Sequence, residues 1–323
     1  MEDRGEKVES LEKEITNVSL KTRFLLSLRQ GLLNRLLPVW LASLGLSIFV
    51  VYMLDSMVGR SGGEQVIMTS GRFVGTAALS LICEYVDSTL GMGYGTTLTP
   101  LLLLIGYDPV QVVPALLVSQ WLAGIAAGIS HTRAGNIDLS MGSLHLKVAL
   151  TLSACGIVGA LVAVRVFISF TQPVLTLLIG FVVVIVGVVI LATRNHPIKF
   201  SWWKIIFVGV IASFNKGFSA GGYGPIVTGG QVLSGLVSRA AISITVLSEG
   251  ITCLVAVMAF LASGEVKDLS VAFPLVVGAV CGVPFSAYTV RRVPMKNLTV
   301  MIGYVTIILG LVTLYKSWIS FTA

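Results

Sequence analysis

The chain alternates long apolar runs with short polar segments, and most of the runs have the length of a membrane-spanning helix. A helix that crosses a bilayer needs roughly 20 apolar residues. Two other helices, at 73–88 and 204–218, end at glycine-rich segments, and the apolar runs after them, 97–105 and 226–233, are too short to cross alone. The pattern predicts an all-α polytopic membrane protein with full spans at 36–54, 110–130, 144–167, 174–193, 239–261, 270–290 and 298–318.

The two glycine-rich segments break apolar sequence at Leu90-Gly91-Met92-Gly93-Tyr94-Gly95-Thr96-Thr97 and at Ala220-Gly221-Gly222-Tyr223-Gly224-Pro225. Irregular backbone at membrane depth is tolerated only where protein or a water-lined cavity covers it. We therefore expect the two breaks to lie inside the protein, to face each other and to form the substrate site.

The second half of the chain repeats the first without a gap, at an offset of 129 residues. The Gly-Tyr-Gly triplets coincide, Thr99 falls on Thr228, and Ser119 falls on Ser248. The predicted organisation is a tail (1–35), an extra span and loop (36–71), repeat one (72–193), a basic linker (194–203) and repeat two (204–323).

Composition supports the membrane class: 55% of residues are hydrophobic, 11% are charged, and the mean hydropathy is +0.93. A soluble domain carries about 25% charged residues. The net charge of +7 does not indicate nucleic-acid binding, because the basic residues lie in short loops between apolar runs.

The distribution of these basic residues predicts the orientation of the chain. With the N-terminus in the cytoplasm, the cytoplasmic segments hold fifteen Lys or Arg and the outside segments hold five. Repeat one then begins outside and repeat two inside, which makes them inverted repeats, as in many secondary transporters. We expect a multi-pass protein of the cytoplasmic membrane in contact with lipid; association into a homo-oligomer is compatible with this pattern.

Each break opens a short helix, and the start of a helix carries unpaired N–H groups and a partial positive charge. Such a start is a ready anion site, so a small tetrahedral oxyanion is the expected partner. Glycine lets the backbone approach a ligand closely, and the tyrosines would add phenolic donors. The predicted substrate-binding residues at the breaks are Gly93, Tyr94, Gly95, Thr96, Thr97, Gly222, Tyr223, Gly224 and Pro225.

Charged residues inside apolar segments are costly and therefore suggest function. Lys216 precedes the second break and is the predicted direct partner of the anion, and Asp87, which aligns with it, could pair with it. Glu249 aligns with Gln120, so an acid in one repeat corresponds to an amide in the other. Glu249 and Glu84 are the candidates for proton coupling, with structural ion pairing or hydrogen bonding as the alternative.

Other functions find less support in the sequence. Two Gly-Tyr-Gly triplets are reminiscent of a potassium-channel filter, which keeps an anion or cation channel with re-entrant loops as the alternative. Paired catalytic motifs and clustered metal ligands are absent from the sequence, so we expect no enzyme activity, no cofactor and no metal. The alternative for the breaks themselves is that small residues let helices pack.

At the breaks the chain resembles the sulfite exporter TauE/SafE family of membrane transporters. The resemblance covers roughly residues 73–316 and implies transport of sulfite or small organosulfur anions. Tyrosine stands where the family usually has glycine in both breaks, which would reshape the pocket. The matching positions are Gly91-Met92-Gly93-Tyr94-Gly95, Pro100, Gly106 and Ala115 in the first copy; Gly221, Gly222, Gly224, Pro225, Gly235 and Ala240 in the second; and the loop Arg133-Ala134-Gly135-Asn136-Ile137-Asp138.

Overall fold

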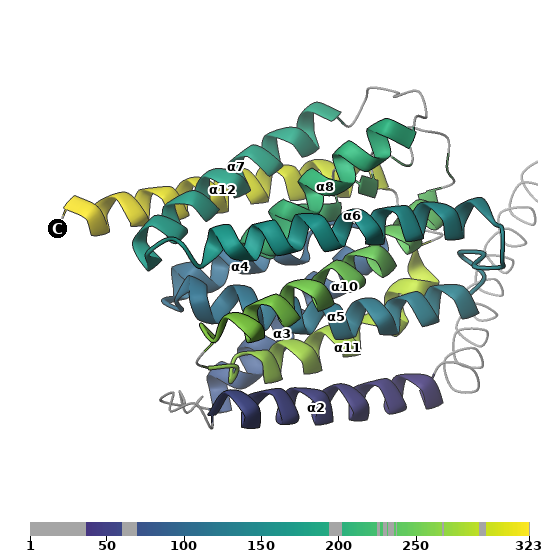
Figure 1. Cartoon of the computed structure of the whole chain (residues 1–323), viewed down its shortest axis with the longest axis horizontal. Helices are drawn as coiled ribbons and strands as arrows, with labels where there is room; N and C mark the ends of the chain where they lie inside the picture. Colours follow the sequence, from purple (N-terminus) through teal and green to yellow (C-terminus); the bar gives the residue numbers. More distant parts are fainter. Residues whose placement is uncertain are drawn as a thin grey trace, which may run out of the picture.

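The computed structural model contains helices and no strands in the part of the chain that it describes, which is residues 37–59, 70–193, 202–224, 227–228, 231, 236, 238–266, 268–290 and 295–322. The helices lie roughly along one common direction (Figure 1). They are α2 (Leu37–Gly59), α3 (Ser70–Leu90), α4 (Tyr94–Ile105), α5 (Pro109–Arg133), α6 (Leu144–Phe167), α7 (Gln172–Thr193), α8 (Trp202–Ser219), α10 (Ser238–Ser263), α11 (Ala272–Thr289) and α12 (Met295–Thr322).

Among the described residues, six helices are long and apolar enough to cross a membrane: α2, α5, α6, α7, α10 and α12. The predicted all-α membrane fold is therefore confirmed. The span expected at 270–290 corresponds to α11, whose stretch Ala272–Ala287 falls, with Tyr94–Ile105 of α4 and Ile205–Ser219 of α8, among the shorter apolar helices. The predicted loop at 55–72 is also too long, because α2 continues to Gly59 and α3 begins at Ser70.

The helices pack in pairs whose members come from the two halves of the chain. α5 packs against α10, α3 against α11, α6 against α8, and α7 against α12. At the offset of 129, α3 corresponds to α8 and α6 corresponds to α11. The contact between α3 and α11 therefore has an equivalent contact between α8 and α6. In Figure 1, α7 and α12 lie along one edge of the bundle and α2 lies along the opposite edge.

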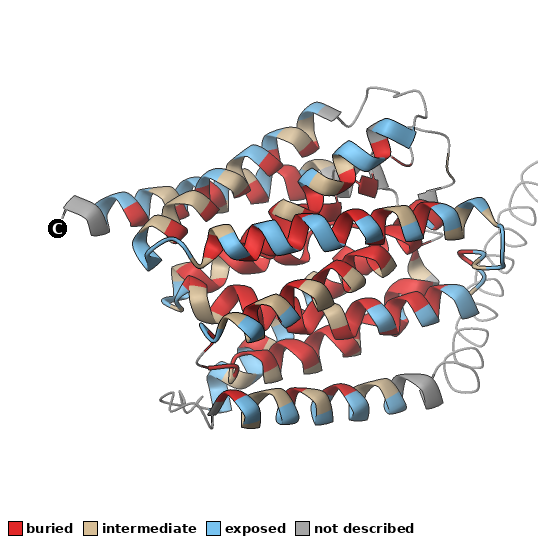
Figure 2. Cartoon of the chain, in the orientation of Figure 1, coloured by how far each residue is buried: buried red, intermediate tan, exposed pale blue. Residues whose placement is uncertain are grey.

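Burial is concentrated in the middle of this arrangement. Figure 2 shows the central helices largely buried, whereas α2 and α12 alternate between exposed and partly buried positions. Only 17% of the apolar window of α2 is buried, and its large side chains point outward, as expected for a helix in contact with lipid. The extra N-terminal span is therefore peripheral, and it packs on α11 and α5.

The central crossing of α5 and α10 depends on two glycines that let the helix backbones touch. A Cβ atom on Gly124 would lie 2.8 Å from the Cα atom of Gly250 and 3.0 Å from the carbonyl oxygen of Val246. Small residues at helix crossings are the usual means of close packing in membranes. This contact holds α5 and α10 in fixed register, one turn from Gln120 and beside Glu249.

We expect Gly124→Ala to lower the thermal unfolding midpoint in detergent, because the added methyl group meets backbone that cannot move aside. Overpacking of this kind costs typically about 1–3 kcal/mol. The matched control is Gly45→Ala on α2, where an added Cβ atom meets nothing within 4 Å. Equal midpoints for the two variants would contradict a tight crossing at Gly124.

Candidate functional site

The first break is a short non-helical segment between α3 and α4. Gly91 and Gly93 have φ angles of +73° and +132°, which favour glycine. The amide of Gly91 donates to the carbonyl oxygen of Asp87 at 2.5 Å and closes the end of α3. The Asp87 side chain accepts a hydrogen bond from the amide of Tyr94 at 3.1 Å, so one residue joins the end of α3 to the start of α4.

Helix α4 begins at Tyr94, three residues before the start that the sequence predicts at Thr97. Tyr94 donates its amide to Asp87, and Thr97 donates its amide to the carbonyl oxygen of Gly93 at 3.1 Å. Among the described residues, the first-turn amides of α4 that have no hydrogen-bond partner are those of Gly95 and Thr96. At the first break, the amides of Gly95 and Thr96 are therefore the ones that could meet an anion.

The far end of α4 is also fixed. The ammonium group of Lys316 on α12 donates to the carbonyl oxygens of Leu103 and Leu104 at 3.2 and 3.0 Å. These are among the last carbonyls of the helix, where a cation interacts favourably with the helix dipole. The short helix is thus held at both ends.

The second break has the same local geometry as the first. The amide of Ala220 donates to the carbonyl oxygen of Lys216 at 2.9 Å, which corresponds to the bond between Gly91 and Asp87 at the offset of 129. Ala220 and Gly222 have φ angles of +56° and +75°. A left-handed conformation is unusual for a residue with a Cβ atom and marks a constrained backbone. Pro225, a predicted site residue, lies outside the described residues.

The two breaks are in direct backbone contact. A Cβ atom on Gly95 would collide with the carbonyl oxygen of Ala220, and one on Gly224 would collide with the carbonyl oxygen of Gly91. The contact is reciprocal, because Gly95 corresponds to Gly224 and Gly91 to Ala220. The breaks therefore meet in the interior, and glycine is required at these positions by close approach of the chain.

Two threonines tie the breaks together across this contact. The hydroxyl of Thr99 donates to the carbonyl oxygen of Ser219 at 2.8 Å, and the hydroxyl of Thr228 donates to that of Gly91 at 3.2 Å. Thr99 and Thr228 correspond at the offset of 129. Each thus closes the hydrogen bonds of the opposite break.

The sequence predicts that the phenolic hydroxyls of the two breaks donate to a ligand. In the structure they hydrogen-bond to serine side chains instead. Tyr94 Oη lies 2.6 Å from Ser119 Oγ and 2.9 Å from Ser80 Oγ. Tyr223 Oη donates to Ser248 Oγ at 3.2 Å. Both tyrosines are fully buried, at 0% exposure. Each ring therefore anchors the start of a short helix to α5 or α10.

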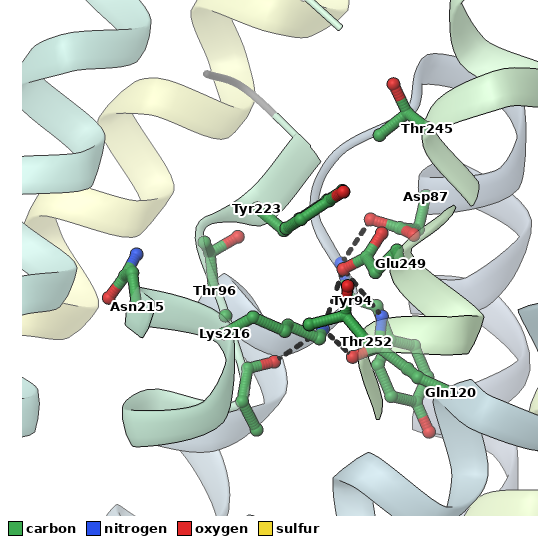
Figure 3. Close-up of polar contacts among 12 residues, drawn as sticks. Asp87, Tyr94, Thr96, Gln120, Asn215, Lys216, Tyr223, Thr245, Glu249 and Thr252 are labelled. Carbon is green, nitrogen blue, oxygen red and sulfur yellow. Dashed lines mark hydrogen bonds and ion pairs between the residues drawn. The ribbon is translucent and has the colours of Figure 1, made fainter. Parts of the chain in front are cut away.

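Beside the breaks lies a buried ion pair. Lys216 Nζ is 2.7 Å from Glu249 Oε1, and it also donates to Gln120 Oε1 and, at 2.8 Å, to the carbonyl oxygen of Ala220 (Figure 3). Gln120 Nε2 reaches Glu249 Oε1 at 3.5 Å. Lys216 is 1% exposed and Glu249 is 4% exposed. Among the described side chains, the ion pair of Lys216 is with Glu249 and not with Asp87, the residue that the alignment places opposite it.

Two further carboxyls lie in this region. Asp87 is bound to the start of α4, and Glu84 accepts a hydrogen bond from the hydroxyl of Ser88 at 2.6 Å. The second carboxyl oxygen of Glu84 is buried and has no hydrogen-bond partner among the described residues. The interior thus holds the carboxyls of Glu84, Asp87 and Glu249 around one lysine.

The sequence analysis did not assign Ser80, Ser119, Ser248 or Gln120 to the site. The alignment of the two halves could have pointed to three of them, because it places Ser119 on Ser248 and Gln120 on Glu249, the predicted proton-coupling residue. Within the described ranges, no group of three His, Cys, Asp or Glu side chains could hold a metal ion. The cysteines there are free thiols.

This arrangement of apolar helices around two broken ones, with a buried ion pair beside the breaks, is that of a multi-pass membrane protein. The sequence profile of the sulfite exporter TauE/SafE family matches residues 76–313, and the chain belongs to this family. It is accordingly a membrane transporter and not an enzyme.

One curated relative is similar over most of its length. The probable membrane transporter protein YtnM of Bacillus subtilis (strain 168) is 26% identical over 261 residues, which cover 76% of this chain and 84% of the relative. No solved structure matched the chain. The family therefore supports a small anionic substrate and a lipid environment.

We expect Tyr94→Phe to destabilise the protein more than Tyr223→Phe. Loss of the Tyr94 hydroxyl leaves the fully buried Ser119 without its described partner, whereas Ser248 still donates to the carbonyl oxygen of Ile244 at 2.8 Å. An unsatisfied buried polar group costs about 1–3 kcal/mol. Thermal unfolding of the two variants in the same detergent measures the difference, and an equal or larger loss in Tyr223→Phe would contradict the anchoring role of Ser119.

Proposed function

We propose that this protein is a secondary transporter that carries a small sulfur oxyanion, sulfite or a small organosulfonate, across the cytoplasmic membrane by alternating access. The observation that carries the proposal is the direct contact of the two glycine breaks beside a buried lysine. The N-terminus lies in the cytoplasm, as the positive-inside distribution favours.

The anion binds at the start of α4 in this proposal. The amides of Gly95 and Thr96 are available there, and the partial positive charge of the helix start favours a negative ligand. The carbonyl oxygen of Ala220 lies against Gly95 in the structure. An anion must therefore displace this carbonyl, which requires the two breaks to move apart. The present arrangement then corresponds to a state in which the breaks are closed on each other.

Alternating access follows if the two halves are inverted repeats. Reciprocal contacts at an offset of 129 support this proposal: Gly95 with Ala220 and Gly224 with Gly91. In transporters of this kind, one half rocks against the other around a site near the midplane. The glycine contact is a surface at which such movement can open a path on either side.

A channel with two re-entrant filters is less well supported. Backbone carbonyls line the filter of a potassium channel, whereas the carbonyls of Gly91 and Ala220 already accept hydrogen bonds from Thr228 and Lys216. The family is one of transporters. The start of α4 also favours an anion over a cation.

Purified protein should bind sulfite and methanesulfonate in calorimetry, and Lys216 should contribute directly. Removing Lys216 alone would leave Glu249 buried without its cation, which can unfold the protein. The test therefore uses Lys216→Met in a Glu249→Gln background and compares it with Glu249→Gln alone. Loss of a charge-assisted hydrogen bond should weaken binding by about 1.5–3 kcal/mol.

The matched control for this experiment is Lys147→Met, which removes an exposed lysine from the first turn of α6. Its affinity should equal that of the unmodified protein. An unchanged dissociation constant in the Lys216→Met, Glu249→Gln variant would make Lys216 purely structural. Failure of the unmodified protein to bind either anion would refute the proposed substrate class.

A further inference from the structure

The ammonium group of Lys216 has no donor to spare. An ammonium carries three N–H donors, and three acceptors surround this one: Glu249, Gln120 and the carbonyl oxygen of Ala220. An anion can therefore bind Lys216 only by replacing one of them. Resting on the proposed function, we propose that the substrate anion replaces the Glu249 carboxylate and that one proton binds to Glu249 in the same step.

Glu249 is the acceptor that an incoming anion displaces most readily. The amide of Gln120 and the carbonyl of Ala220 are neutral, so moving either of them away, as opening of the breaks moves Ala220, does not change the charge beside Lys216. Glu249 carries the same charge as the substrate and lies 2.7 Å from the ammonium nitrogen. Two anions on one buried cation would leave one negative charge uncompensated, in an environment where charge interacts strongly.

A displaced Glu249 cannot remain ionised where it lies. It is 4% exposed, and a buried carboxylate without a counter-charge is strongly destabilising. Within the described part of the chain, the other titratable groups whose charges reach the pair are acids and supply no replacement cation. They are the carboxyls of Glu84 and Asp87 on α3, the thiol of Cys253 on α10 and the phenol of Tyr223 after the second break.

Gln120 is placed to receive the protonated form of Glu249. The glycine contact between Gly124 and Gly250 brings the two side chains together across α5 and α10. The amide can donate to the carboxylate and can accept from the neutral carboxyl, because it carries both N–H and C=O groups. The same pair can therefore hold Glu249 in both states.

The charge balance gives a stoichiometry. One proton from the aqueous side on which the site is open bonds to a carboxylate oxygen of Glu249, and one monovalent anion pairs with Lys216. The site has the same net charge before and after, so the loaded transporter moves one anion and one proton without net charge. A pH gradient then drives accumulation, and a membrane potential does not.

The first test is calorimetric titration of the purified protein with methanesulfonate, whose charge is constant from acidic to neutral pH. Repeating the titration in buffers of different ionisation enthalpy counts the protons that bind with the anion. We expect one proton for each anion. Because one proton binds with each anion, the dissociation constant should rise about tenfold per pH unit.

The decisive variant is Glu249→Gln, whose side chain resembles the neutral carboxyl. It should take up no proton with the anion, and its affinity should not change with pH. In proteoliposomes it should still exchange labelled for unlabelled anion, but it should not accumulate anion in response to a pH gradient. Sulfite changes its own protonation near neutral pH, and this contributes to the measured proton uptake. The number of protons bound by Glu249 is then the uptake of the unmodified protein minus the uptake of this variant.

Two more variants separate Glu249 from its neighbours. Glu84→Gln should retain uptake of one proton, because Glu84 does not pair with Lys216. The double variant Gln120→Glu, Glu249→Gln should recover uptake of one proton, because it moves the acid to the other side of the same lysine. Recovery would also exclude a folding defect as the cause of the loss in Glu249→Gln.

The outcomes distinguish this inference from the function on which it rests. If neither sulfite nor methanesulfonate binds the unmodified protein at any pH, the proposed function fails and the inference fails with it. If an anion binds without proton uptake, or if Glu249→Gln still takes up a proton, the proposed function stands and only the inference is overturned.

Discussion

The structure depends on one constraint: backbone groups freed inside the membrane must find partners within the protein. Two helices are broken in the interior, and each break frees the last carbonyls of one helix and the first amides of the next. Several of these groups form hydrogen bonds with residues of the opposite break. Thr99 bonds the carbonyl of Ser219, Thr228 bonds the carbonyl of Gly91, and Asp87 takes the first amide of α4. Glycine is needed where these backbones touch.

The position of the buried lysine follows from the same constraint. The carbonyl of Lys216 accepts the amide of Ala220 and ends α8, and its ammonium group reaches the carbonyl of Ala220. The residue that closes the helix thus also carries the charge of the site. Any movement that separates the breaks must disturb Ala220 and so the surroundings of Lys216. Opening of the breaks and pairing of the lysine are mechanically linked in this geometry.

Most of the fold could be predicted from the sequence, because apolar run length determines helix position in a membrane protein. Helix α6 was predicted at its observed bounds, and the two breaks were located from their glycines. The start of α4 was placed three residues late, since glycine and threonine give weak signals for where a helix begins. The partner of Lys216 was also missed. That choice depends on how closely α5 and α10 cross at Gly124 and Gly250, which spacing along the chain does not encode.

The polar interior is asymmetric at positions that the offset of 129 relates. Equivalent positions hold Asp87 and Lys216, and equivalent positions hold Gln120 and Glu249. Two glutamates at the second pair of positions would place a further negative charge beside a single cation, and two glutamines would leave that cation without a counter-charge; either is costly in a buried site. One acid and one amide match one lysine. Identical residues at both pairs of positions could not produce this balance, so the two halves differ at the positions that carry charge, whereas Gly95 and Gly224, where the breaks touch, are the same.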